Sequence, residues 1–136
     1  LELGGKSAFL VFPDFDDLDR CAATVAGSMF FNQGESCNAP SRLLVHESIA
    51  DDFARRVAAE APQYRPADPL DAKTVMGALV DDGQLRTVMG YIDAGRSEGA
   101  TVLAGGTQAR TDSGGYYVEP TVFDGVRNDM KIAREE

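Results

Sequence analysis

Two short stretches of this chain carry side chains that could do covalent chemistry. Cys37 follows a helix-length apolar stripe and ends the small polar loop Asn32-Gln33-Gly34-Glu35-Ser36-Cys37. A thiolate on such a turn can attack a carbonyl carbon while backbone N–H groups stabilise the oxygen that becomes negative. Glu2 lies in the second stretch, Leu1-Glu2-Leu3-Gly4-Gly5-Lys6-Ser7, where its carboxylate is a possible general base. The chain therefore contains a candidate nucleophile and a candidate base.

The other residues that could react or bind metal favour structural roles. A single cysteine is more often an inert buried thiol than a nucleophile, and Cys21 lies on the apolar stripe, so we expect it in the core. His46 has no second histidine or nearby cysteine, and we therefore expect no metal site. The two cysteines are too few for a disulfide scaffold and favour a reducing cytoplasm.

Composition narrows the class of protein. With 136 residues and 43% hydrophobic side chains, the chain can bury the core of one domain, residues 1–136. Its formal net charge of −9 argues against nucleic acid and against anionic membrane surfaces, because both favour clustered lysine and arginine. No apolar run approaches the roughly 20 residues that span a bilayer. We therefore expect a soluble cytoplasmic protein.

Hydrophobic periodicity predicts alternating strands and helices. The apolar run at residues 8–12 indicates a buried strand, and apolar residues at spacings of three and four from Leu18 to Phe30 indicate a helix after a cap at Asp14, Asp16 or Asp17. Ser48 and Asp51 approximate a capping box for a second helix. We expect further strands at 43–45, 101–104, 116–118 and 121–123, and a helix from Asp81 or Asp82 to Gly95 or Gly99. This order predicts an α/β fold with a mainly parallel sheet flanked by helices.

The two chemical stretches also carry a family resemblance. Glu2 in Leu1-Glu2-Leu3-Gly4-Gly5-Lys6-Ser7 and Cys37 in Phe31-Asn32-Gln33-Gly34-Glu35-Ser36-Cys37 resemble the paired signatures of the NAD(P)-dependent aldehyde dehydrogenase superfamily. The resemblance continues through Ser41-Arg42, Gly90-Tyr91-Ile92, Glu119-Pro120-Thr121-Val122 and Ile132-Ala133-Arg134-Glu135-Glu136. The amino-acid sequence of residues 32–37 and 43–49 most resembles that of the branch whose members act on aminoaldehydes such as gamma-glutamyl-aminobutyraldehyde.

The resemblance implies a role for particular residues. Cys37 would be the nucleophile, which forms a thiohemiacetal and then a thioester, and Glu2 would activate the hydrolytic water. Further contacts are implied for NAD or NADP and for the aldehyde. The cofactor contacts are Leu3, Gly4, Gln84 and Glu136, and the substrate contacts are Phe31, Ser36 and Asn38.

The resemblance also implies a partial catalytic domain. We expect residues 1–136 to be a truncated piece of that domain, without the cofactor-binding domain. We expect it to be inactive and unable to bind dinucleotide alone, and to form a homo-oligomer through uncovered surfaces. Two alternatives stay open: a non-catalytic binding or assembly module, and a relative that transfers the acyl group to coenzyme A. Glu2 counts against the second, since a hydrolytic base would destroy the thioester.

Overall fold

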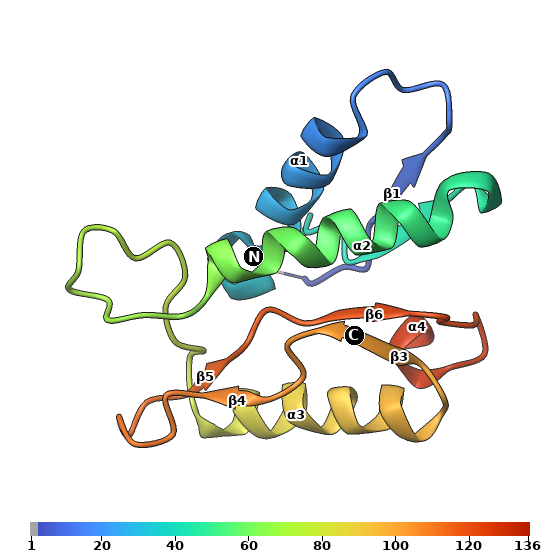
Figure 1. The fold of residues 1–136 in the computed structure, drawn as a ribbon. Coiled ribbons are helices and arrows are strands. Elements are labelled where there is room, and N and C mark those ends of the chain that lie inside the picture. The colour runs from blue at the N-terminus through green and yellow to red at the C-terminus, as the bar shows by residue number, and fades with distance from the viewer. Residues whose placement is uncertain (1–2) are drawn as a thin grey trace.

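The computed structural model describes residues 3–136 and arranges them in two halves (Figure 1). In chain order the elements are β1 (Ala8–Val11), α1 (Leu18–Phe30), η1 (Phe31–Gly34), β2 (Arg42–Val45), η2 (Glu47–Ile49), α2 (Ala50–Glu60), η3 (Ala61–Tyr64), α3 (Asp82–Ser97), β3 (Thr101–Ala104), β4 (Gln108–Ala109), β5 (Tyr117–Val118), β6 (Val122–Asp124) and α4 (Lys131–Arg134), where η marks a 3-10 helix. We call residues 3–64 the N-terminal half, 82–136 the C-terminal half, and 65–81 the connecting segment.

The N-terminal half is a strand–helix–strand unit. β1 and β2 pair in parallel, with Ala8 opposite Arg42 and Val11 opposite Val45, and α1 lies in the connection between them. Parallel neighbours need such a crossover, because a short turn can join only antiparallel strands. The buried residues of α1 are Cys21, Ala22, Val25, Ala26 and Phe30. The predicted stripe of α1 and the structural role of Cys21 are therefore confirmed.

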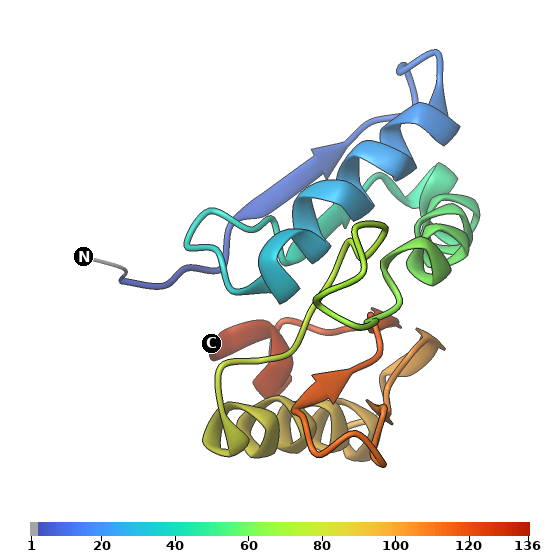
Figure 2. The same cartoon turned by 90° about the vertical axis from the view of Figure 1, so that its left-hand side faces the viewer.

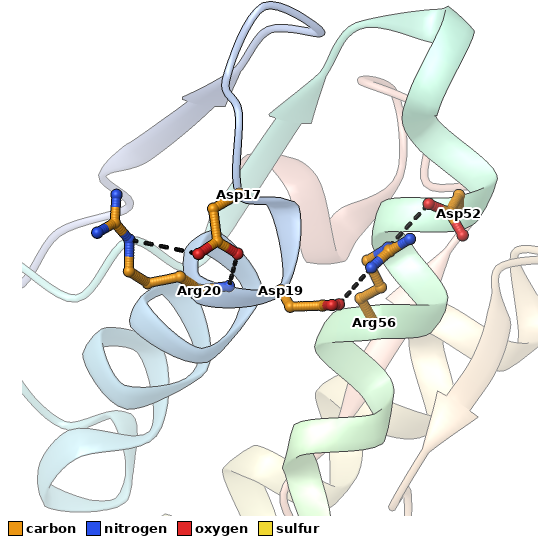
Figure 3. Close-up of polar contacts among 5 residues, drawn as sticks. All are labelled: Asp17, Asp19, Arg20, Asp52 and Arg56. Atoms are coloured by element: carbon orange, nitrogen blue, oxygen red, sulfur yellow. Dashed lines mark hydrogen bonds and ion pairs between the residues drawn. The ribbon is translucent and has the colours of Figure 1, made fainter.

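Charged side chains hold the start of α1 and link it to α2 (Figure 3). The Asp17 carboxylate accepts a hydrogen bond of 2.9 Å from the Arg20 N–H, which confirms one of the predicted N-caps. Arg56 of α2 donates from Nε to Asp52 at 2.8 Å and from Nη1 to Asp19 of α1. Because the two carboxylates are at least half exposed, the ion pairs add little stability, and of the two only the Arg56–Asp19 pair joins α2 to α1.

The strand pairing in the C-terminal half differs from the predicted mainly parallel sheet. Within residues 3–136 only β1 and β2 pair in parallel, whereas β3–β6 and β4–β5 are antiparallel two-stranded sheets. The expectation of a mainly parallel sheet is therefore wrong for the described chain. The chain reverses between β4 and β5, where Arg110 and Gly114 both have positive φ. This reversal returns the chain antiparallel along β4 and β3 instead of through a crossover helix.

The start of α2 differs from the prediction, whereas the end of α3 just before Gly99 agrees with it. The Ser48 capping box is wrong, because α2 has no side-chain cap at Ile49 and His46 Nδ1 instead accepts from the Ser48 N–H at the start of η2. α3 runs through Gly95 and ends at Ser97, before Gly99 with φ 95°. Gly95 is a packing residue, since a Cβ there would lie 2.9 Å from Ile132 Cδ1.

The core joins the two halves across α2, which lies between the α1 layer and the β3–β6 pair (Figure 1). Phe53 and Val57 of α2 are buried against residues of α1 and against Val122 of β6. Met76 of the connecting segment enters the same cluster. Burial of this apolar surface is the main driving force for bringing the halves together. No helix within residues 3–136 is long and apolar enough to cross a membrane.

One face of the parallel pair has no cover. Leu10 and Leu44 are opposite each other in the register and are 59% and 50% exposed, and Phe12 beyond β1 is 56% exposed. Parallel sheets in folded proteins are covered on both faces. This bare face is therefore an expected site of association when the chain is alone.

We predict that the isolated chain associates through the bare face. The double variant Leu10→Lys/Leu44→Lys should shift the chain toward monomer, because paired ammonium groups cannot be buried against a second copy. Leu70→Lys is the control, since Leu70 is exposed in the connecting segment. Sedimentation equilibrium at micromolar concentration measures the change. A wild-type chain that is already a stable monomer would contradict the prediction.

Candidate active site

A cleft of about 540 Å³ lies between the two halves. One wall consists of the segment before β1 and the loop after α1, and the other consists of α3 and the chain end after α4. The lining includes Gly4, Gly5, Lys6, Gln33, Glu35, Ser36, Cys37, Gln84, Tyr91, Glu119, Glu135 and Glu136. The turned view shows the chain end marked C on the same side of the molecule as the segment that leads into β1 (Figure 2). Residues from both ends of the sequence therefore meet at one cleft.

Parallel pairing brings the two sequence signatures together. Because Ala8 pairs with Arg42, the segments that precede β1 and β2 must meet at the same edge of the sheet. Arg42 Nε donates to the Lys6 carbonyl at 2.8 Å, and the Arg42 N–H donates to the Ser7 carbonyl at 3.2 Å. A Cβ at Gly5 would collide with the Cys37 carbonyl oxygen. Glycine is thus required for the backbone to approach the cysteine loop so closely.

Cys37 is exposed at the wall of the cleft, whereas Cys21 is buried in the core. The loop before Cys37 contains three successive residues with positive φ: Asn32 at 49°, Gln33 at 59° and Gly34 at 78°. Side chains disfavour this backbone region, and such residues concentrate at functional sites. The left-handed turn ends the path of α1, so that the thiol lies on a loop and not within the helix.

Glu136 covers the glycine pair from the other wall. Its Oε1 accepts a hydrogen bond of 2.6 Å from the Gly5 N–H, and a Cβ at Gly4 would collide with the same carboxylate. Tyr91 of α3 holds this segment, since its hydroxyl donates to the Glu136 carbonyl at 3.0 Å, and the Glu135 carboxylate lies 3.3 Å from the same hydroxyl. The side-chain carboxylate of Glu136 is thereby fixed beside the Gly4–Gly5 backbone.

The charges in the cleft are mostly negative. Among the described lining residues, four glutamates face one lysine. Burial, and then the charge of Asp81, raises the pKa of Glu35. Burial, and then Arg42, lowers the pKa of Lys6, although the charge of Glu136 acts in the opposite direction. The Lys6 ammonium donates to the Ile132 carbonyl at 2.9 Å and so ties the first motif to α4.

The structure brings five of the candidate residues to this cleft. Cys37, Ser36, Gly4, Gln84 and Glu136 all line it.

Three other candidates lie outside that lining. Leu3 and Phe31 are 84% and 68% exposed, and Asn38 is also exposed. Glu2 lies outside the described residues. The proposed roles of all these residues therefore stay predictions. Within residues 3–136 no group of three or more His, Cys, Asp or Glu side chains is placed to hold a metal ion.

Sequence reasoning missed three residues of the cleft. Gln33, Glu35 and Tyr91 lie within the family motifs, but the sequence alone predicts no role for them. Glu35 gives a usable signal, because it lies two positions before Cys37 in the same polar loop. The bonds of Gln33 and Tyr91 join residues about 45 positions apart, and local patterns cannot reveal them.

The chain belongs to the aldehyde dehydrogenase family, whose model matches residues 1–136.

Solved structures of the same family match the whole chain. It is 53% identical to the aldehyde dehydrogenase KauB from Pseudomonas aeruginosa (TM-score 0.96) and 54% identical to gamma-glutamyl-gamma-aminobutyraldehyde dehydrogenase from Burkholderia cenocepacia (TM-score 0.94). It is 51% identical to a P. syringae AldA indole-3-acetaldehyde dehydrogenase mutant in complex with NAD+ and IAA (TM-score 0.96). Each match covers 100% of this chain but only 28%, 27% and 28% of the respective relative.

We predict that the two cysteines differ in reactivity. Iodoacetamide should modify Cys37 at least about tenfold faster than Cys21, because alkylation needs an accessible thiolate and the Cys21 thiol is buried. Burial also raises the pKa of Cys21, which lowers its thiolate fraction at neutral pH. Peptide mass spectrometry over a time course measures both rates. Equal, slow modification of both residues would instead favour a non-catalytic module.

Proposed function

We propose that this chain is the thiol-bearing part of an aldehyde dehydrogenase catalytic domain. In the complete enzyme this part would oxidise an aldehyde to a carboxylic acid. The observation that carries the proposal is the meeting of two distant motifs at one cleft: Cys37 lies on one wall, and Glu136 lies over the Gly4–Gly5 backbone from the other. The family relationship supports the same reaction class.

The residues at the glycine pair fit the nicotinamide side of NAD. A carboxylate has about four acceptor positions, so Glu136 can bind Gly5 and still accept ribose hydroxyl groups. Gly4 presents no side chain, and Gln84 lies on the same cleft. We therefore propose that Gly4, Gln84 and Glu136 hold the cofactor, with Leu3 beside it. When bound, NAD supplies a hydride acceptor. NAD is preferred over NADP in the proposal because similar enzymes were solved in complex with NAD+.

Cys37 would carry both covalent states of the substrate. Its thiolate attacks the aldehyde carbon and forms a C–S bond, and the carbonyl oxygen becomes the oxyanion of a thiohemiacetal. Loss of hydride from that carbon restores the C=O bond and leaves a thioester on Cys37. Phe31, Ser36 and Asn38 would contact the substrate near the sulfur. The chain's own contribution to this step is a nucleophile fixed in a short, strained loop.

Glu2 would complete the cycle as general base. It would take a proton from a water molecule, whose oxygen attacks the thioester carbon; the C–S bond then breaks and releases the carboxylic acid and the Cys37 thiolate. A coenzyme A-acylating enzyme would transfer the acyl group to a thiol and would have no use for this base. Glu2 therefore favours hydrolysis over acyl transfer.

We further propose an amino-substituted aldehyde as the substrate class. The 54% identity to gamma-glutamyl-gamma-aminobutyraldehyde dehydrogenase supports it, and so does the excess of carboxylates in the cleft, which would attract a substrate ammonium group. The chain alone is proposed to be inactive and unable to hold dinucleotide, because it spans only 27–28% of the length of such enzymes. A homo-oligomer is the proposed state of the complete protein.

The first functional prediction removes the sulfur. In a full-length enzyme that contains this segment, Cys37→Ala should lower aldehyde oxidation by about 10⁴-fold or more, because no covalent intermediate can form. NAD binding, followed by fluorescence titration, should change little. Cys21→Ala is the matched control, since that thiol is buried away from the cleft. Retained turnover in Cys37→Ala would contradict the mechanism.

The second functional prediction separates acylation from hydrolysis. Glu2→Gln keeps the size and polarity of the side chain but cannot accept a proton. Stopped-flow absorbance should therefore show a retained burst of reduced cofactor, with steady turnover lower by about 10²–10⁴-fold. Loss of the burst together with turnover would assign Glu2 to the attack step instead.

A further inference from the structure

Gln33 links the cysteine loop to the segment that connects the two halves of the molecule. Its side chain lines the cleft, and its Nε2 donates a hydrogen bond of 3.1 Å to the Ala78 carbonyl in the connecting segment. The bond is partly buried, which protects it from competition by water. It therefore joins the loop that carries the nucleophile to a segment 45 positions further along the chain.

The backbone at Gln33 is held in an unfavourable conformation. Gln33 has φ 59° and ψ 18°, and it follows Asn32, which has φ 49° and ψ 47°. A residue with a Cβ seldom adopts this region unless surrounding contacts hold it there. The Glu35 N–H closes the turn on the Asn32 carbonyl at 2.9 Å, and Gln33 adds the link to Ala78. These two bonds account for how the strained turn before Cys37 is maintained.

The acceptor of this bond belongs to a well-anchored segment. Met76 is buried in the core, and the Leu79 N–H donates to the Tyr116 carbonyl at 2.7 Å. Two residues later Asp81 caps α3 by accepting from the Gln84 N–H at 2.8 Å. Ala78 is thus tied to the wall of the cleft that carries Gln84.

The Gln33 side-chain amide also packs closely against Gly77. A Cβ at Gly77 would lie 3.2 Å from Gln33 Nε2, so glycine leaves the space that the amide occupies. The amide reaches a backbone carbonyl and not the sulfur, and so it acts on the reaction through the position of the loop.

We propose that Gln33 is a positioning residue for the aldehyde dehydrogenase reaction. Its bond to Ala78 fixes the thiol loop relative to the α3 wall, which sets the distance between the sulfur and the bound nicotinamide. This inference rests on the proposed function, in which Gln84 and Glu136 of the α3 wall hold the cofactor. Small displacements of reacting groups can cost about 10²-fold in rate.

The test is Gln33→Glu in a full-length enzyme that contains this segment. The carboxylate has the same shape but cannot donate to Ala78, and it would repel that carbonyl. The rate of the hydride-transfer burst should fall about 10- to 100-fold at neutral pH. The rate of Cys37 alkylation by iodoacetamide should stay within about twofold of wild type, because alkylation needs no cofactor wall.

The pH dependence gives the distinguishing readout. The introduced carboxyl can donate its O–H only when it is protonated, that is, below its pKa. The burst rate of Gln33→Glu relative to wild type should therefore begin to recover as the pH is lowered from about 8 to about 5.5, and it should recover further toward the ordinary glutamate pKa of about 4.3. Gln33→Asn, whose amide is one methylene shorter, should lose the burst without this recovery. It also provides the test if Gln33→Glu fails to bind NAD and has therefore not folded.

Gln108→Glu is the matched control, since Gln108 is exposed on β4 outside the cleft lining. If Cys37→Ala abolishes the burst while Gln33→Glu behaves like Gln108→Glu at every pH, the positioning role is wrong and the proposed function stands. A loss in Gln33→Glu that is equal in burst and alkylation and independent of pH would also overturn the role. If Cys37→Ala keeps the burst, the proposed function itself is wrong.

Discussion

The contact between the Gly5 backbone and the Cys37 carbonyl is the constraint on which the rest of the site depends. A Cβ at Gly5 would overlap that oxygen, and the Gly5 N–H is at the same time bound by Glu136. Three segments of the chain therefore converge on one glycine. Any residue with a side chain would push the cysteine loop away from the first motif and would open the wall of the cleft.

Sheet pairing and core burial make this convergence possible. The parallel register of β1 and β2 places both motifs at one edge of the sheet, and α1 provides the crossover between them. Burial of Phe53 and Val57 between the halves then brings the α3 wall toward the thiol. The chemistry of the site thus depends on long-range packing, although each motif is only a few residues long.

The sequence predicted those parts of the structure that depend on local patterns. The stripe of α1, the burial of Cys21 and the Asp17 cap follow from spacing and side-chain type, and all three are found. The antiparallel pairs β3–β6 and β4–β5 were not predicted, because strands of two to four residues do not reveal which partner they will meet. The left-handed turn at Asn32 and Gln33 was not predicted: asparagine is enriched at positive φ, but Gln33 gives no such signal.

The central claim is that Cys37 bears the acyl group during turnover. Its most direct test is mass spectrometry of a full-length enzyme that contains this segment, mixed with aldehyde and NAD and quenched in acid within one turnover. The Glu2→Gln background should accumulate the thioester and so raise its yield. The account predicts the mass of the acyl group on the peptide that contains Cys37. An acyl group on Cys21, or turnover without any acylated cysteine, would contradict it.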